Sequence, residues 1–466
     1  MLRSRFFCLL ALLAVVPGLA RSAPPPAKPN IVFILSDDQA YTDYGFMGHP
    51  HIQTPNLDKL AARSAVFTRG YVPTALCRPS LATLATGLYA HQHKISGNDP
   101  SPALAKPDSP RYNELRERLI QHMDAVPNLP RLLVQQGYLA HQSGKWWEGS
   151  YKRGGFTHGM TRGFPEKGGR HGDDGLNIGR DGLQPVFDFV DMAQQEKKPF
   201  YLWYSPFMPH TPHNPPERFL AKYRDKVTSL EVAKYYAMCE WFDETCGQLL
   251  GYLDQKGLTE NTLVYYICDN GWIQDPNSKN YAPRSKQSPY EGGIRQPILI
   301  SWPGKIKPGK HEDLVSSIDL VPTLLKAAGA AVPENLPGLD LMPLMTEGRK
   351  LERDTLYGEG FDHDVADVDV PEESLLYRWA IEGRWKLLLT YDGTLSPRYV
   401  SSHPRTEKRP QLFDLLADPA EEHNLAAQNP EVVKRLAGKI ATWWPVTKRQ
   451  VITEWNDTPQ EWKPRP

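Results

Sequence analysis

Short apolar runs, rich in β-branched and aromatic residues, each stop abruptly at polar or charged residues. Three of them are NIVFILSDDQ at 30–39, PFYLWYSPFMPH at 199–210 and TLVYYICDNG at 262–271. Runs without apolar–polar alternation are typical of strands that are buried on both faces of a parallel sheet. This feature constrains the fold most, because such strands need helices to cover them.

Helical patterns lie between these runs. TPNLDKLA at 54–61 begins with Thr54 as a predicted N-cap, followed by proline at the first helical position. LPRLLVQQGYLAHQSGKWW predicts a helix that stops at Gly137 and is followed by a strand, and SSIDLVPTLLKAAG predicts an amphipathic helix that closes at Gly329. AVFTRGYV at 65–72 is a further candidate strand.

The pattern changes from about residue 350. RWAIEGRWKLLLTYD and PQLFDLLADP resemble antiparallel strands, and a terminal helix is expected near 430–444. We therefore expect an α/β fold, with a mostly parallel central sheet flanked by helices and a smaller C-terminal antiparallel-sheet subdomain. The expected domains are a catalytic domain at 24–349 and an α+β subdomain at 350–466.

The N-terminus has the pattern of a cleaved secretory signal peptide at 1–23. Arg3 and Arg5 precede the apolar stretch FFCLLALLAVVPGLA, which Pro17 interrupts, and small residues follow it. A membrane anchor is the alternative, but the apolar stretch is short for a span. No second long apolar segment follows, so we expect a secreted or periplasmic protein with no membrane span after cleavage.

The overall charge argues against a nucleic-acid partner. The 466 residues include 54 Lys and Arg and 54 Asp and Glu, so no broad basic surface is expected. Of the five cysteines, Cys8 lies in the signal peptide. Cys239 and Cys246 are seven residues apart in a helical pattern, about 10 Å along the axis, which is too far for a disulfide.

Polar residues follow three of the predicted strands: Asp37 and Asp38, His210, and Asp269 and Asn270. Each group has a structural alternative, namely a helix cap, a loop histidine and a tight turn. Their joint position at the carboxyl ends of parallel strands, where α/β proteins bind ligands, favours a shared site. Carboxylate and amide oxygens suit a hard divalent cation such as Ca²⁺ or Mg²⁺.

Two lysines complete this pattern. Lys145 lies in SGKWW and Lys286 in RSKQSPYEGG. Either lysine alone would be read as a solvated surface charge. Lysines and a metal around a tetrahedral oxyanion are the arrangement used for sulfuryl or phosphoryl transfer.

From about Asn30 to the C-terminal region, the chain resembles the formylglycine-dependent sulfatases of the alkaline-phosphatase-like superfamily. The shared stretches occur in the same order: NIVFILSDDQ, TPNLDKLA, CRPS followed by TG, SGKW, PHTPH, CDNG, EGGIRQP, SWPG, DLVPTLL and LFDLLADPAEEHNLA.

The resemblance implies a Ca²⁺ site and a modified cysteine. The implied Ca²⁺ ligands are Asp37, Asp38, Asp269, Asn270 and the modified Cys77. A maturation enzyme would oxidise Cys77 to formylglycine. Its hydrated aldehyde would attack sulfur, and the sulfated intermediate would then collapse to aldehyde and inorganic sulfate.

The resemblance also implies roles for the cations. Lys145 and Lys286 match the lysines that bind sulfate, and His210 matches the histidine near the leaving oxygen, where it would donate a proton.

The chain departs from the family pattern at two positions. Leu81 stands where the motif C-x-P-S-R has arginine, and Trp147 stands where G-K-W-H has histidine. We expect Arg78, three residues before Leu81, to replace the missing cation, although it could also face solvent.

Three further residues are candidates for substrate binding. His158 and His171 lie in the segment 154–182, which contains ten glycines, and either histidine could replace the one that is missing at Trp147. Arg295 lies in EGGIRQP.

These observations favour an exported sulfatase that hydrolyses a sulfate ester, on a sulfated carbohydrate or another sulfated small molecule. Two alternatives stay open. One is a phosphate or phosphonate ester hydrolase of the same superfamily, and the other is an inactive homologue that binds sulfated glycans.

Overall fold

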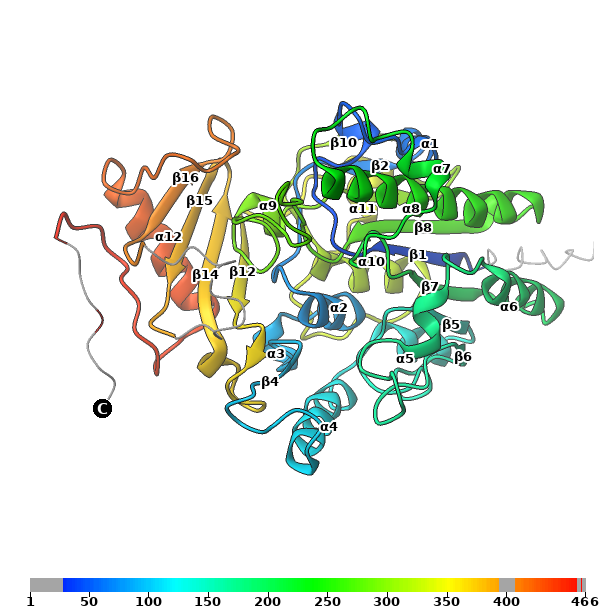
Figure 1. Ribbon diagram of the computed structural model, residues 1–466, viewed down its shortest axis with the longest axis horizontal. Helices are drawn as coiled ribbons and strands as arrows, with labels where there is room; N and C mark the ends of the chain where they lie inside the picture. Colours follow the sequence, from blue (N-terminus) through cyan, green and yellow to red (C-terminus); the bar gives the residue numbers. More distant parts are fainter. Residues whose placement is uncertain (1–27, 394–406, 459–461, 463–466) are drawn as a thin grey trace, which may run out of the picture.

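The computed structural model describes residues 28–393, 407–458 and 462. An eight-stranded sheet forms its centre, in the order β10-β2-β9-β8-β1-β7-β5-β6 (Figure 1). The neighbouring strands β8, β1, β7, β5 and β6 are parallel to one another, whereas β9 runs antiparallel to both β8 and β2. The bounds are β1 (Asn30–Ser36), β2 (Ala65–Phe67), β5 (Leu139–Gly144), β6 (His158–Gly159), β7 (Phe200–Ser205), β8 (Thr262–Cys268), β9 (Ile298–Ser301) and β10 (Gly309–His311).

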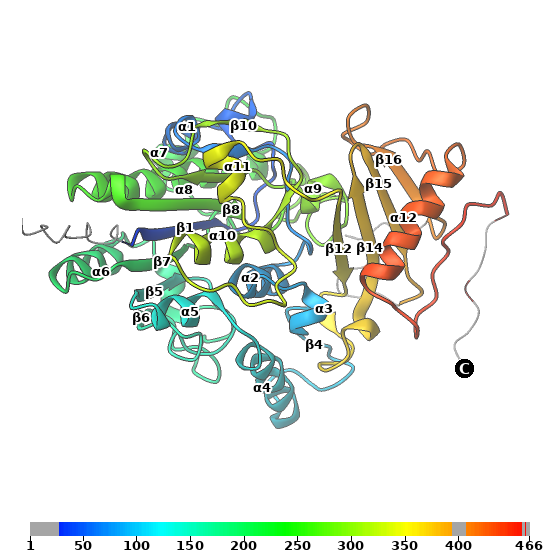
Figure 2. The same ribbon diagram turned by 180° about the vertical axis from the view of Figure 1, so that it is seen from behind.

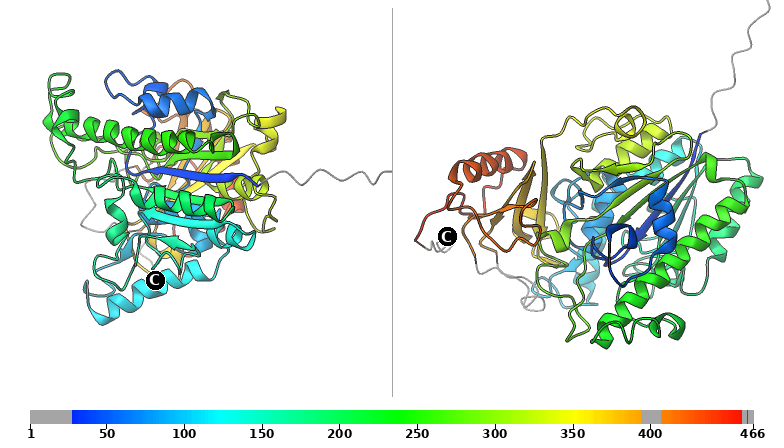
Figure 3. Two further views of the ribbon diagram at one scale, coloured as in Figure 1. Left: turned by 90° about the vertical axis from the view of Figure 1, so that its right-hand side faces the viewer. Right: turned by 90° about the horizontal axis from the view of Figure 1, so that it is seen from above.

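Helices cover both faces of this sheet (Figure 3). Alternate residues of β1 point to opposite sides, so that Ile31 and Phe33 pack in one core and Val32 packs in the other. The first core contains residues of α2 (Cys77–Thr86), α5 (Leu129–Gln135), α10 (Leu320–Ala327) and α11 (Met342–Glu347). The second contains residues of α1 (Pro55–Ala62), α6 (Gln184–Gln195) and α8 (Leu230–Gln255). The expected α/β fold is confirmed.

A second, antiparallel sheet follows in the C-terminal part of the chain (Figure 2). Its order is β12-β14-β15-β16, with bounds β12 (Thr355–Phe361), β14 (Leu375–Glu382), β15 (Trp385–Thr390) and β16 (Gln411–Asp414). Leu387 and Leu389 pack with residues of α12 (Pro430–Trp443), and Leu388 packs into the core of the large sheet. The small sheet is therefore buried on both faces. The domain boundary at residue 350 lies between α11 and β12 and stays a prediction.

The prediction of a single strand over residues 65–72 is wrong. The first part of this stretch is β2 of the large sheet, while β3 (Gly70–Tyr71) pairs with β11 (Val315–Ser316) in a separate sheet. Between them, Arg295 donates to the Thr68 carbonyl. In addition, a Cβ on Gly70 would lie 2.4 Å from the Gln296 carbonyl oxygen, so the backbones approach closely there.

The remaining elements are short or peripheral. They are β4 (Asp99–Pro100) paired with β13 (Asp364–Val365), α3 (Ala90–His93), α4 (Pro110–Asp124), α7 (Glu217–Leu220), α9 (Glu291–Ile294) and the 3₁₀ turns Gly45–Met47, Asp173–Asn177, Thr259–Asn261, Ser317–Asp319 and Pro371–Ser374.

Several local predictions are confirmed. Thr54 is the N-cap residue of α1, although its side chain bonds to Gly45 and Asp58 instead of capping the helix. Cys239 and Cys246 both lie on α8 and are unpaired. Among the described residues, no helix is long and apolar enough to cross a membrane. The predicted signal peptide lies outside the described residues.

Candidate active site

The carboxyl ends of three neighbouring strands meet at one edge of the large sheet. Asp37 directly follows β1, and its amide donates to the Met208 carbonyl in the segment after β7 (3.0 Å). The amide of Asp269, directly after β8, donates to the Ser36 carbonyl (3.1 Å). Backbone pairing therefore holds the three polar strand ends together, as the sequence predicts.

Two of the aspartates and the asparagine form one hydrogen-bonded group. The Asp38 amide donates to Asp269 Oδ1 (3.1 Å), and Asn270 Nδ2 donates to Asp38 Oδ1 (2.7 Å). Asp38 has a φ of +65°, in the left-handed region. This conformation turns the chain at Asp38 and lets consecutive aspartates face one site.

Both predicted lysines reach the carboxylates. Lys145 Nζ lies 2.7 Å from Asp37 Oδ1 and 3.5 Å from Asp269 Oδ2, and Lys286 Nζ lies 2.7 Å from Asp38 Oδ2. Lys145 follows Gly144, which has a φ of +86°. A Cβ on Gly144 would lie 1.8 Å from the Ser205 carbonyl oxygen, so only glycine lets the chain reach this position.

His210 lies over the same group. Its Nε2 is 3.3 Å from Asp38 Oδ2, and its ring stacks on Phe207 with centroids 4.2 Å apart. Nδ1 is 2.7 Å from the Thr211 carbonyl oxygen, and because a carbonyl only accepts, Nδ1 holds the proton of the neutral ring. Burial lowers the pKa of His210 well below its usual range.

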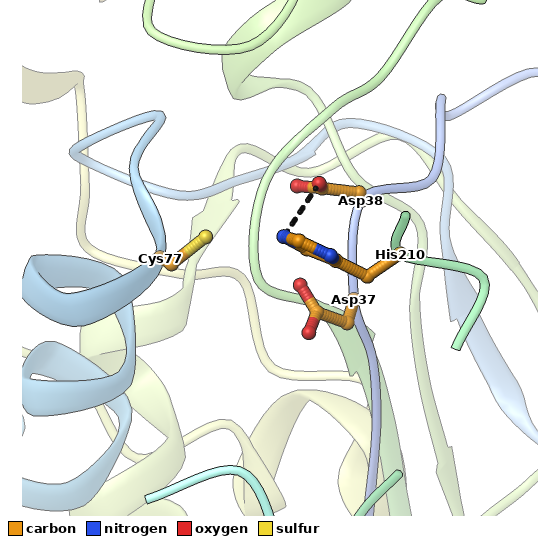
Figure 4. Close-up of side chains that lie close together, drawn as sticks. All are labelled: Asp37, Asp38, Cys77 and His210. Carbon is orange, nitrogen blue, oxygen red and sulfur yellow. Dashed lines mark ion pairs between the residues drawn. The ribbon is translucent and has the colours of Figure 1, made fainter. Parts of the chain in front are cut away.

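Cys77 faces this group from the other side. It is the first residue of α2, and its sulfur points toward Asp37, Asp38 and His210 (Figure 4). One ligand atom from each of these four residues lies within 4.8 Å of the others. Ser80 Oγ donates to the Asp269 carbonyl (2.6 Å), which fixes the start of α2 against the end of β8.

The buried charges favour a cation. Three carboxylates face two lysines, and Asp37 Oδ2, Asp269 Oδ2 and Asn270 Oδ1 are buried without a hydrogen-bond partner. Burial raises the pKa of Asp37 well above its usual value. Burial acts in the same direction on Asp38, but Lys286 and His210 outweigh it and lower the pKa to about 2. Buried carboxylate and amide oxygens that have no hydrogen-bond partner are suitable ligands for Ca²⁺.

The free Cys77 thiol also fits a residue that is modified before it acts. Burial raises the pKa of Cys77 to about 12, and Lys145 and Lys286 offset this only in part. A thiol with this pKa is a poor nucleophile at neutral pH.

Arg78 does not replace the missing arginine. It is completely buried, so it does not face solvent either. Its Nε and Nη2 donate to the two carboxylate oxygens of Glu148 (2.7 and 2.8 Å), and Nη1 donates to the Asn98 carbonyl (3.1 Å). Leu81 is 3% exposed and packs in the first core. The ion pair with Glu148 supplies the buried Arg78 guanidinium with the carboxylate that it needs.

The candidate substrate-binding residues divide into two groups. His171 lies near the site, since its ring is 5.2 Å from that of Trp147 and 5.4 Å from that of Phe207. His158 lies on the edge strand β6, where it contacts Thr157 and Phe189 and no residue of the site.

Arg295 also lies apart from the Cys77 site. It donates to the Thr68 carbonyl, lies 3.5 Å from Glu291 and stacks on Tyr41.

Several neighbours of the site carry no sequence signal strong enough to single them out. Asn98 accepts a hydrogen bond from the amide of Arg78 (3.0 Å), and Glu148 pairs with the side chain of Arg78. Arg170 lies 4.6 Å from the Trp147 ring. Asn98 and Arg170 lie on loops, where no periodic pattern predicts their direction. The position of Glu148 directly after SGKWW is the one available hint.

Comparison with known proteins identifies the family of the chain. The model of the family described as Sulfatase matches residues 29–330. The chain belongs to the sulfatase family. A second model, described as N-sulphoglucosamine sulphohydrolase, C-terminal, matches residues 284–443. This sulfatase is accordingly a sulfuric ester hydrolase with the expected fold.

Individual relatives cover nearly the whole sulfatase chain. It is 31% identical to arylsulfatase A from Bos taurus, over 90% of this chain and 87% of that protein. It is 29% identical to N-acetylgalactosamine-6-sulfatase from Mus musculus, over 91% and 86%. A solved structure of Ps i-CgsB in complex with k-i-k-neocarrahexaose superposes with a TM-score of 0.68 at 25% identity, covering 90% of this chain and 94% of that one.

Proposed function

We propose that the protein is an exported, Ca²⁺-dependent sulfatase that hydrolyses a sulfate ester on a carbohydrate, with formylglycine at position 77. The observation that carries the proposal is the arrangement of Cys77 opposite Asp37, Asp38 and His210, with ligand atoms within 4.8 Å of one another. Relatives with names such as N-acetylgalactosamine-6-sulfatase support a sulfated sugar as the substrate. An exported enzyme also meets such sugars outside the cell.

The carboxylates and the amide would hold Ca²⁺, through Asp37, Asp38, Asp269 and Asn270. The bound ion and the aldehyde hydrate supply an electrophilic site for the sulfate oxygens and an oxygen nucleophile for sulfur. With the carboxylates neutralised in this way, the two lysine ammonium groups would be available to bind sulfate.

The residues around the sulfate have separate tasks. Lys145 and Lys286 bind and orient the sulfate oxygens and stabilise the charge that develops during transfer. His210 holds its Nε2 toward the site and would donate a proton to the leaving oxygen after gaining one from solvent or from the reaction itself. Phe207 fixes the plane of the imidazole ring.

The deciding experiment compares matched aryl sulfate and aryl phosphate substrates, using protein made in its native host. We expect sulfate turnover to exceed phosphate turnover and to be lost in Cys77→Ala. Mass measurement of the peptide that spans Cys77 should find the aldehyde form. Faster phosphate turnover would instead support the phosphate or phosphonate alternative. A plain thiol together with tight glycan binding and no turnover would support an inactive binding homologue.

A further inference from the structure

A cluster of charges beside the Cys77 site contains more arginine than acid. Asp99 pairs with two arginines, Arg116 through one carboxylate oxygen and Arg170 through the other, with Arg170 Nε 2.9 Å away. Arg116 also donates to the Arg170 carbonyl (2.9 Å). Two guanidinium groups therefore share one carboxylate, which leaves one positive charge in excess.

The excess charge is accessible only at Arg170. The side chain of Arg116 is 3% exposed, whereas that of Arg170 is 44% exposed. Arg116 lies on α4 behind the cluster, and Arg170 lies on the glycine-rich segment 154–182. A ligand in solution can therefore reach the Arg170 guanidinium while Asp99 and Arg116 hold it in place.

The cluster is in contact with the residues around Cys77. The Arg170 guanidinium lies 4.6 Å from the centre of the Trp147 ring, and Trp147 is two residues after Lys145. The guanidinium of Arg78, the residue after Cys77, lies 5.9 Å from the same ring. Burial opposes the charge of Arg170, but the neighbouring Asp99 carboxylate outweighs it and raises its pKa.

A second observation points to a ligand here. Trp147 is 2% exposed, and its indole Nε1 is buried without a hydrogen-bond partner. His171 Nδ1, from the neighbouring ring, is also buried without a partner. Buried polar atoms of this kind are normally satisfied, and a polar group of a ligand beside this ring pair would supply the missing partners.

We propose that Arg170 binds a second anionic group of the substrate, next to the sulfate that is cleaved. This inference rests on the proposed function and narrows the substrate to a sulfated glycan with a further acidic group on the same or an adjacent sugar. A guanidinium fork suits the two oxygens of a carboxylate or of a second sulfate equally well. The face of the Trp147 ring positions the Arg170 guanidinium through a cation–π contact.

The test uses three disaccharides with the same scissile sulfate. One has no other anion, one carries a carboxylate and one carries a second sulfate. For the wild type, kcat/KM should be higher with one or both dianionic sugars, and that sugar identifies the second anion. In Arg170→Ala this preference should fall about tenfold, mainly through KM, and Arg170→Lys should restore part of it.

Arg162→Ala is the matched control. Arg162 lies on the same segment, is 57% exposed and pairs with Asp174 at 3.2 Å, so its loss should leave the preference unchanged. The subsite is refuted if Arg170→Ala keeps the wild-type preference, or if kcat falls equally for all three sugars. Calorimetric binding of the dianionic sugar by Cys77→Ala and by Cys77→Ala/Arg170→Ala tests the subsite without turnover. Equal affinities there would also refute it, whereas absence of any sulfate turnover would count against the proposed function instead.

Discussion

Leu81 stands at the position where the resemblance to the family implies an arginine, and its surroundings suit an apolar side chain. The side chain packs among apolar residues of the first core, where an arginine would need a buried partner. Glu148 is already paired with Arg78. The guanidinium beside Cys77 therefore stabilises the fold, and Lys145 and Lys286 are the cations that pair with the aspartates of the site.

The Arg78–Glu148 pair leads to the first prediction. Glu148→Ala should lower the free energy of unfolding by about 3–5 kcal/mol, because it leaves a fully buried guanidinium without its carboxylate. Chemical denaturation measures this change. Glu114→Ala is the control, since Glu114 forms an exposed pair with Arg111 (side chains 65% and 66% exposed), and it should cost less than about 1 kcal/mol. Equal losses in the two variants would contradict the structural role assigned to Arg78.

Asp269 offers a test of the proposed Ca²⁺ site that does not depend on turnover. Asp269→Asn removes one of three carboxylates, so purified protein should retain less Ca²⁺ by elemental analysis, and added Ca²⁺ should raise its Tm less than in the wild type. Glu422→Gln is the control, because Glu422 belongs to an exposed acidic group with Asp418 and His423. A fall in bound Ca²⁺ in the control alone would place the metal at that exposed group.

At the scale of elements, the end of β5 determines where Lys145 lies. Gly144→Ala should destabilise the protein by well over about 2 kcal/mol and displace Lys145, because its Cβ meets the Ser205 backbone at 1.8 Å in addition to the unfavourable positive φ. Gly137→Ala, with a φ of +88° and nothing within 4 Å, should cost only about 1–2 kcal/mol. Thermal unfolding compares the two, and similar Tm values would contradict the steric argument.

The elements also show what could be predicted from sequence. The buried runs ending at Asp37, His210 and Asp269 predict both the sheet and the site, because hydrophobic patterning and parallel strand ends are local signals. The contacts of Arg78 and Arg170 could not be predicted in this way, since their partners Glu148 and Asp99 lie 70 and 71 residues away along the chain. The split of 65–72 depends on Gln296, which no local pattern reveals.

At the scale of the whole molecule, a buried ion cluster joins the small sheet to the large one. Lys386 of β15 lies 2.7 Å from Glu421 and 3.3 Å from Glu291 of α9. The Glu291 amide also donates to Glu421 (2.6 Å). One ammonium group thus faces two carboxylates at the contact between the sheets.

This cluster predicts a pH-dependent stability. Burial raises the pKa of Glu421 from its usual 4.5 to about 7, although Lys386 opposes the shift. The folded state therefore holds a proton that the unfolded state releases, and the contribution of Glu421 to the free energy of unfolding should fall as pH rises from about 4.5 to 7. Urea denaturation across this range should find that Glu421→Gln becomes more stable relative to the wild type by a few kcal/mol (about 1.4 per pKa unit). Glu422→Gln should show no such change relative to the wild type. A dependence unchanged in Glu421→Gln would assign the titration to another group.

The site is assembled from distant parts of the sequence. Lys145 reaches Asp37 across 108 residues, Asp269 reaches Asp38 across 231 and Lys286 reaches it across 248. Pairings of such long range form slowly, because chain entropy is lost before the contacts stabilise the fold. During refolding, helical structure should therefore return well before catalytic activity, and no fragment that ends before Lys286 should regain activity.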